Sequence, residues 1–275
     1  MNIKTILGQK TAYKDQYDNS LLQPISRLLA RDNIKIPAPL PFSGYDIWNC
    51  YEVSWLNLKG KPEVKILELI VNAESENIIE SKSLKLYLNS FNNTKFASSA
   101  EVLELIQKDL TLVVNSQVTV IINDLESYEG KLLSSFKGIN LDKIDIFIDN
   151  FTIAENLPKL SDENIQVEET LYSNLLKSNC LVTNQPDWAS IQISYKGLKI
   201  QPDSLLKYLI SFRNHNEFHE QCVEQIFWDI SKLCEPKELV VYARYTRRGG
   251  IDINPVRASY VLNIAEIENL RHIRQ

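Results

Sequence analysis

Apolar residues along the chain recur with two periods, one of about two residues and one of three to four, which predict strands and helices respectively. The first run of such elements has the order strand, strand, helix, helix, strand, strand. We expect these elements at residues 48–57, 63–71, 81–92, 98–110, 118–124 and 144–151. The helix at 98–110 opens with Ser98 and Glu101, which match a capping box. The strand at 144–151 has isoleucine at alternate positions.

The same order returns after a polar, acidic segment at 152–170, which we interpret as a connector. The second run is expected as a strand that contains Cys180, a strand at 189–200, helices from Pro202 and from about Glu217, and strands at 239–245 and 251–262. Around these we expect a short strand at 181–183, a turn at 184–186 and a bulge near 196–197. The chain is therefore predicted to be an α+β protein with a tandem ββααββ unit, at about 48–151 and 171–265.

The first 47 residues sustain neither period and contain four prolines, at positions 24, 37, 39 and 41. We expect an ordered arm that packs on the core through Leu21, Leu22, Ile25, Leu28 and Leu29. The predicted division of the chain is an arm at 1–47, a first module at 48–155 and a second module at 156–275.

Composition narrows the class of protein. Of 275 residues, 44% are apolar and 24% are charged, as in a soluble globular protein. A formal net charge of −5 disfavours a nucleic-acid polymer as a direct ligand and favours a small substrate. We expect no signal peptide and no membrane span, because no apolar run is long enough. The four cysteines show no close pair, which is typical of a reducing cytoplasm.

The stretch Ser178–Trp188 carries the first candidate chemistry. Cys180 and Asp187 lie seven positions apart, with Pro186 just before the acid. A thiol at one end of a strand and an acid on the returning segment can face one pocket, as a nucleophile and its proton donor. The alternative is that the cysteine is a small buried apolar residue and the acid is part of a turn.

The stretch Glu80–Tyr87 lies where a strand meets a helix. Ser81 or Ser83 can cap this helix, and free backbone N–H groups there favour an anion. Lys82 and Lys85 are three positions apart, so both can reach one phosphate. The alternative is a capped surface helix with solvated lysines.

Two further stretches are candidates for ligand binding. His215 and His219 have the spacing of metal ligands, with Cys222 nearby, but they match no zinc motif, so His219 and Glu220 fit better as a polar pair at a helix start. Arg244, Arg247 and Arg248, beside Gly249 and Gly250, can hold a phosphate. A structural histidine and a charged hairpin tip are the respective alternatives.

Together these stretches resemble the 7-cyano-7-deazaguanine reductases, the nitrile reductase family of queuosine biosynthesis, in their long two-module form. Glu80–Tyr87 matches the family signature at every position. Cys180 and Asp187 match its Cys–Asp pair, and Phe218–Glu220 matches its Phe-His-Glu. Trp48–Asn57 and Leu21–Pro24 are also similar to the long form.

The resemblance implies the tunnelling fold, a homodimer, and reduction of a nitrile to a primary amine with two NADPH. We expect no bound metal, because the set of possible metal ligands in the sequence is sparse. It implies that Cys180 is the nucleophile that forms a thioimide and that Asp187 is the proton donor. The residues that it assigns to the substrate are Ile79, Glu80, Ser81, His219 and Glu220, with Glu80 and Glu220 accepting from the N–H edge of the base. Those that it assigns to NADPH are Ser81, Lys82, Arg248 and Gly249.

Two other classes of protein remain open at this point. A hydrolase that resembles GTP cyclohydrolase would use Cys180 and the histidines to hold zinc, and metal analysis would detect it. A purine-binding module without catalysis would need no thiol, so the pairing of Cys180 with Asp187 argues against it.

Overall fold

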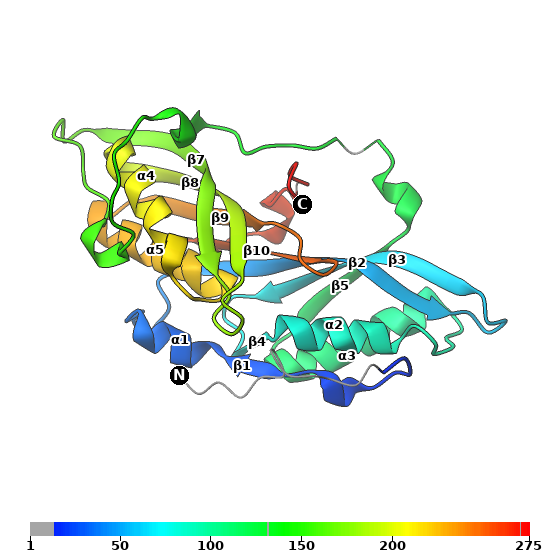
Figure 1. Ribbon diagram of the computed structural model, residues 1–275. Helices are drawn as coiled ribbons and strands as arrows, with labels where there is room; N and C mark the ends of the chain where they lie inside the picture. Colours follow the sequence, from blue (N-terminus) through cyan, green and yellow to red (C-terminus); the bar gives the residue numbers. More distant parts are fainter. Residues whose placement is uncertain (1–13, 131, 270) are drawn as a thin grey trace. The chain divides into compact units, whose positions relative to one another are not determined.

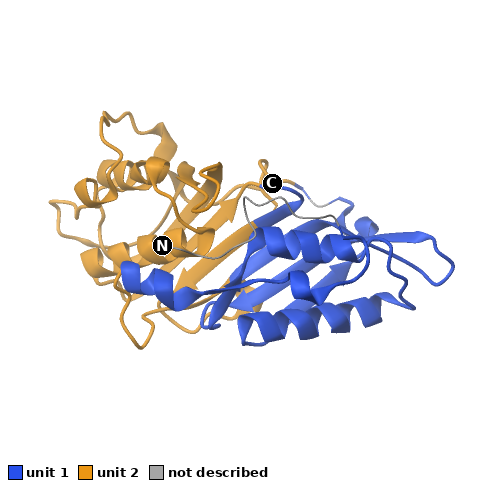
Figure 2. Ribbon diagram, turned by 60° about the horizontal axis from the view of Figure 1, so that its bottom comes forward, with its two compact units in different colours: residues 1–33, 46–132, 247–252 blue, residues 34–45, 133–246, 253–275 orange. Residues whose placement is uncertain are grey.

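The computed structural model of the protein describes residues 14–130, 132–269 and 271–275. The chain divides into two compact units, and Figure 2 shows each in its own colour. Unit 1 is drawn from residues 1–33, 46–132 and 247–252, and unit 2 from residues 34–45, 133–246 and 253–275. The division into an arm and two modules stays a prediction.

Unit 1 holds most of the first predicted run of elements. Its elements are β1 (Pro24–Ser26), α1 (Arg27–Asn33), most of β2 (Ser43–Leu56), β3 (Pro62–Asn72), β4 (Asn77–Ile79), α2 (Ser81–Ser90), α3 (Ser99–Val114) and β5 (Val118–Asn123) (Figure 1). β3 pairs antiparallel with β5, with Ile66 opposite Asn123. Helix α3 buries Val102, Ile106 and Leu110 at a spacing of four residues, and Ser98 caps it by accepting from the Glu101 N–H.

Unit 2 contains a complete ββααββ order. Its elements are a short β6 (Ile139–Asn140), β7 (Gln166–Asn179), β8 (Pro186–Leu198), α4 (Pro202–Ser211), α5 (His219–Cys234), β9 (Glu238–Tyr245) and most of β10 (Ile251–Ala258). The strands lie in the order β10-β9-β8-β7-β6, antiparallel except for the parallel pair β6–β7. Helix α4 begins at Pro202, as predicted. The α+β class and the antiparallel ββααββ unit are therefore confirmed.

The strand predicted at 144–151 is wrong. Its isoleucines are half-buried and alternate with exposed side chains such as Phe147, but the segment joins no strand ladder among the described residues. Alternation reports which side chains face the protein, whereas a strand also needs a neighbour to receive its backbone hydrogen bonds. The first run therefore has one strand after its helices rather than two.

The details predicted around the β7–β8 hairpin also change. Residues 181–183 form a turn instead of a short strand, and Pro186 begins β8 instead of lying in a turn. The bulge lies in β7, between Ser173 and Leu176, while Gly197 pairs regularly with Val167. Gly197 is needed for another reason, because a Cβ there would lie 3.1 Å from Pro236 Cα.

The segment before β2 is held by different residues from those predicted. Leu22 and Ile25 are buried, but Leu28 and Leu29 are 64% and 53% exposed. Helix α1 instead buries Arg27, whose guanidinium pairs with the buried Asp46 carboxylate. None of the helices in residues 14–130, 132–269 and 271–275 combines the length and the apolar character that crossing a membrane requires.

Candidate active site

The β7–β8 hairpin places Cys180 at its tip. β7 ends at Asn179, opposite the first residue of β8, Pro186. The loop between them is closed by two backbone hydrogen bonds, from the Cys180 N–H to the Gln185 carbonyl (2.8 Å) and from the Asn184 N–H to the Cys180 carbonyl (3.0 Å). The backbone that carries the thiol is therefore fixed on both sides of the sulfur.

Cys180 and Asp187 belong to the same hairpin. Asp187 lies directly opposite Ser178 in the ladder, so the two side chains share a face. Cys180 lies one residue beyond the end of β7, at the start of the loop, so it is outside the strand that was predicted to contain it. The spacing of seven residues places the thiol at the hairpin tip and the carboxyl on the returning strand, with a turn between them rather than the short strand predicted.

Cys180 is also the most accessible of the four thiols. Cys50, Cys222 and Cys234 are buried, whereas Cys180 is partly exposed. Burial raises the pKa of Cys50 and Cys222 well above that of a free thiol, and it raises the pKa of Cys234 to about 11. A thiolate is the nucleophilic form of cysteine, so the three buried thiols are poor candidates for attack on a substrate.

Asp187 has a defined partner on α5. Its Oδ2 lies 3.4 Å from His219 Nε2, and the two side chains are only 3% and 14% exposed. The His219 ring stacks on Tyr245, with ring centroids 3.8 Å apart and planes 12° from parallel. His219 is therefore oriented by the carboxylate at one side and the tyrosine ring at the other.

A second layer of polar groups lies around the buried Cys222 thiol. The hydroxyls of Ser178 and Tyr245 lower the pKa of this thiol, whereas the negative charges of Glu217 and Asp187 raise it. The sequence analysis missed Ser178, Tyr245 and Glu217 as site residues. Of these three, only Ser178 could have been identified from the sequence, because it lies two positions before Cys180 and so on the same face of a predicted strand.

The start of α5 places the predicted polar pair. His219 is its first residue, and Glu220, in the first turn, is 3% exposed. The capping residue, Phe218, offers no side-chain hydrogen bond. Across the described part of the chain, no group of three or more histidine, cysteine or acidic side chains is placed to hold a metal ion.

In unit 1, Glu80 rather than a serine caps α2. Its Oε1 accepts from the Lys82 N–H (3.0 Å) and its Oε2 from the Ser83 N–H (2.8 Å). The prediction that Ser81 or Ser83 caps the helix is therefore wrong, and Ser83 instead donates to the Glu80 carbonyl. Burial raises the pKa of Glu80, and the two backbone hydrogen bonds oppose that shift.

The other predicted residues of this helix start differ in exposure. Ile79 ends β4 opposite Pro24 with its side chain 2% exposed. Ser81 is exposed and Lys82 is partly buried in the first turn of α2. Ser81 and Lys82 therefore have side chains within reach of a ligand at the start of the helix.

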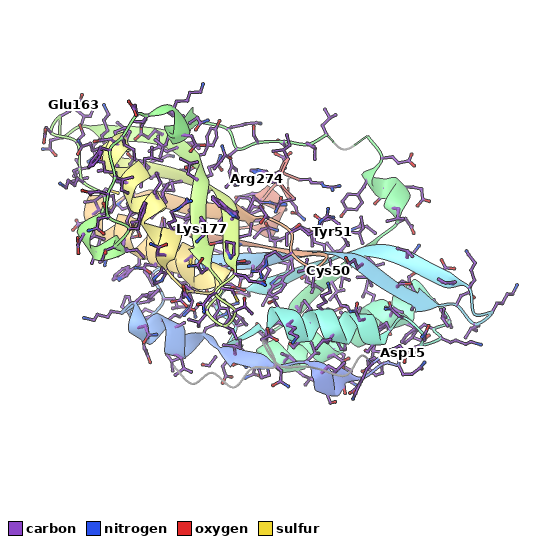
Figure 3. The ribbon with its side chains drawn as sticks, viewed as in Figure 1. Asp15, Cys50, Tyr51, Glu163, Lys177 and Arg274 are labelled. Atoms are coloured by element: carbon purple, nitrogen blue, oxygen red, sulfur yellow. The ribbon has the colours of Figure 1, made fainter. Side chains whose placement is uncertain are left out.

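The arginine–glycine turn lies beside α2 in unit 1. The N–H of Arg248 and the carbonyl of Ile251 close a two-residue turn whose glycines both have positive φ, 56° and 77°. A Cβ on Gly249 would lie 2.7 Å from Lys85 Nζ, so the turn packs against the lysine. Arg247 lies 4.6 Å from the centroid of the Tyr51 ring, and Tyr51 extends from β2 (Figure 3).

Arg244 does not belong to this cluster of arginines. It is 2% exposed in unit 2 and donates to the Gln275 amide oxygen, to the Tyr242 hydroxyl and to Asn269. Its guanidinium is therefore committed to buried structure, and phosphate binding stays a prediction for Arg247 and Arg248 alone.

Comparison with known proteins identifies the family. Residues 13–122 match the family described as "Nitrile reductase, 7-cyano-7-deazaguanine-reductase N-term", and residues 186–261 match the "QueF-like protein" family. Proteins from Cupriavidus pinatubonensis and Ralstonia nicotianae, each named "NADPH-dependent 7-cyano-7-deazaguanine reductase", are 52% and 54% identical over 271 residues, which is 98% of this chain and 97% of each relative.

A solved structure of an archaeosine synthase described as "QueF-Like", in its apo form, aligns with 37% of this chain and 99% of its own, at 15% identity and a TM-score of 0.30. The curated relatives are far more similar and span the whole length. The two family matches cover residues 13–122, which include Glu80, and residues 186–261, which include Asp187 and Phe218. The chain belongs to the 7-cyano-7-deazaguanine reductase family.

Proposed function

We propose that this protein reduces the nitrile of 7-cyano-7-deazaguanine to the primary amine of 7-aminomethyl-7-deazaguanine, in queuosine biosynthesis, with NADPH as the reductant. The relatives that bear this activity in their names share more than half of their residues with the chain over nearly its full length. The observation that carries the proposal is the partly exposed Cys180 at the tip of the hairpin whose returning strand holds Asp187 beside His219.

Cys180 is the proposed nucleophile. Its sulfur adds to the electrophilic nitrile carbon, and the thiol proton passes to the nitrile nitrogen through Asp187, which gives a thioimide. This step consumes no proton from outside, because the thiol supplies the one that nitrogen receives. His219 holds the Asp187 carboxyl from 3.4 Å, so it orients the proton donor and can exchange protons with it.

Two NADPH molecules, bound in turn, would each supply one hydride to the former nitrile carbon. The residues around the glycine turn suit such a group, since Arg247 and Arg248 of the turn and Lys85 of α2 are cations, and a Cβ at Gly249 would lie 2.7 Å from Lys85 Nζ. Ser81, Lys82, Arg248 and Gly249 are the residues that we propose to hold it. Guanidinium groups suit the additional phosphate that distinguishes NADPH from NADH.

The remaining assignments rest on the motif resemblance. We propose that Glu80 and Glu220 accept hydrogen bonds from the N–H groups of the base and that Ile79, Ser81 and His219 contact it. We further propose a homodimer, which sedimentation of the purified protein would test.

The test of the nucleophile is intact-mass analysis after mixing the protein with 7-cyano-7-deazaguanine in the absence of NADPH. Wild type should gain the mass of one substrate molecule with nothing lost, and the Cys180→Ala variant should gain none. The Cys50→Ala variant is the matched control, because it removes a buried thiol, and it should still form the adduct. An adduct that persists in Cys180→Ala would refute the assignment.

A further inference from the structure

A second set of buried titratable groups lies beside the hairpin in unit 2. A cavity of about 710 Å³, open to solvent, is bounded by the loop at 151–157, by residues of α5 and by His215. Its wall includes polar atoms, so water molecules can bind there. These atoms belong to Lys35, Asn214, Gln225 and Asp229. None of these residues has a role in the proposed binding of substrate or NADPH.

His215 connects this cavity to Glu217. It lines the cavity, and its Nε2 lies 3.8 Å from Glu217 Oε2. This nitrogen is buried and has no hydrogen-bond partner in the described part of the chain. A small movement of either side chain would bring the two atoms into hydrogen-bond contact.

Glu217 lies next to the nucleophile's hairpin. Its N–H donates to the Asn179 carbonyl (3.0 Å), and the Asn179 N–H donates to the His215 carbonyl (2.8 Å), so the segment pairs with the residue that precedes Cys180. The side chain is only 11% exposed. Its charge and that of Asp187 both raise the pKa of the Cys222 thiol. Glu217 and Asp187 therefore border one buried cluster.

The proposed reaction needs protons that this cluster can deliver. Reduction of a nitrile to an amine adds two hydrides to carbon and two protons to nitrogen, and NADPH supplies the hydrides only. Thioimide formation uses the proton of the thiol, so both external protons are needed in the later reductive steps. In the proposed adduct the substrate occupies the Cys180 sulfur, so a route through the protein would keep protons available to Asp187.

We propose that His215 and Glu217 carry protons from the cavity to the Asp187–His219 pair. The inference rests on the proposed function. Both residues act through Asp187 and not on the substrate, so they are positioning residues for proton supply. The titratable and charged groups nearby are Lys35 and Asp229 of the cavity wall, Cys222 of α5 with Asp187 of β8 and Tyr245 of β9 around its thiol, and Lys177 of β7, labelled in Figure 3, which donates to Asn179 and to the Arg213 carbonyl.

The protonation states suit this role. Burial raises the pKa of Glu217 to about 7, and burial lowers the pKa of His215 below its ordinary value. Near neutral pH, Glu217 is close to half protonated and His215 is mostly neutral. Glu217 can therefore give up and regain a proton at little cost in free energy.

The test is the Glu217→Gln variant of the full chain, studied in two assays. Adduct formation with 7-cyano-7-deazaguanine in the absence of NADPH should be unchanged, because that step needs no external proton. Steady-state turnover with NADPH should fall about 100-fold, the lower end of what a positioned proton-transfer group contributes. Wild-type kcat should decline as the pH rises through about 7, and the variant should lose this decline.

Two further variants separate proton supply from packing. Glu217→Asp keeps a carboxyl and should restore much of the turnover, while Asp229→Asn removes a carboxyl from the cavity wall without breaking the connection and should turn over normally. If Glu217→Gln does not fold, His215→Gln carries the same prediction at the cavity end.

Three outcomes would overturn the inference. The first is that Glu217→Gln, or His215→Gln where it replaces that variant, keeps wild-type turnover and pH dependence. The second is that Glu217→Asp is as slow as Glu217→Gln, and the third is that adduct formation and turnover fall equally. A wild type that forms no adduct and consumes no NADPH would instead refute the proposed function, and with it the inference.

Discussion

Replacing Glu217 by glutamine should stabilise the protein, and the gain should depend on pH. Burial raises the pKa of this carboxyl from 4.5 to about 7. Each pKa unit corresponds to about 1.4 kcal/mol, so ionising the buried group costs about 3 kcal/mol of folding free energy. Glutamine has nearly the same shape but carries no charge, so the variant avoids this cost.

The sign follows from proton binding. Between pH 4.5 and about 7 the folded state holds a proton on Glu217 that the unfolded state has lost. The free energy of unfolding therefore falls as the pH rises through this window. Below it the carboxyl is protonated in both states and costs nothing, and above it the full cost of about 3 kcal/mol applies.

The assay is urea denaturation of wild type and Glu217→Gln at intervals from pH 4.5 to 8. The difference in unfolding free energy between variant and wild type should grow by about 3 kcal/mol over this range, because other groups contribute equally to both proteins. Glu104→Gln, a change at an exposed carboxyl of α3, should show no such growth. A difference that stays flat would refute the buried, proton-holding carboxyl.

Three other substitutions test separate parts of the structure. Asp187→Asn should slow adduct formation about 100-fold in a mass-spectrometric time course, because the amide cannot relay the proton. Arg257→Met should lower the unfolding free energy by roughly 3–5 kcal/mol in urea, since it leaves the buried Glu224 carboxylate unpaired; an unchanged midpoint would contradict this. Gly250→Ala should cost about 1 kcal/mol or more by the same assay, because φ is 77° and the new Cβ would clash with Glu52.

The helices and long strands were predictable because their signals are local. Helix α3 buries residues four apart, and α4 begins at a proline, so the sequence itself contains the pattern that packing uses. The segment at 144–151 shows the limit of that reasoning. It alternates like a strand, but pairing depends on which distant segment lies beside it, and that information is absent from the segment.

The candidate site divides in the same way. Cys180 and Asp187 were found because a hairpin joins them over a short sequence distance. Glu217 and Tyr245 were missed because their roles come from burial and stacking against elements far along the chain. Glu80 was expected to bind a ligand only, and its capping of α2 was missed because serine is the commoner cap.

The most direct test of the account follows NADPH absorbance during reaction with a limiting amount of 7-cyano-7-deazaguanine, for wild type and Cys180→Ala side by side. Wild type should consume two NADPH per nitrile, and Cys180→Ala, folded as judged by circular dichroism, should consume none. A folded wild type that leaves NADPH untouched, or a Cys180→Ala variant that consumes it at the wild-type rate, would contradict the account.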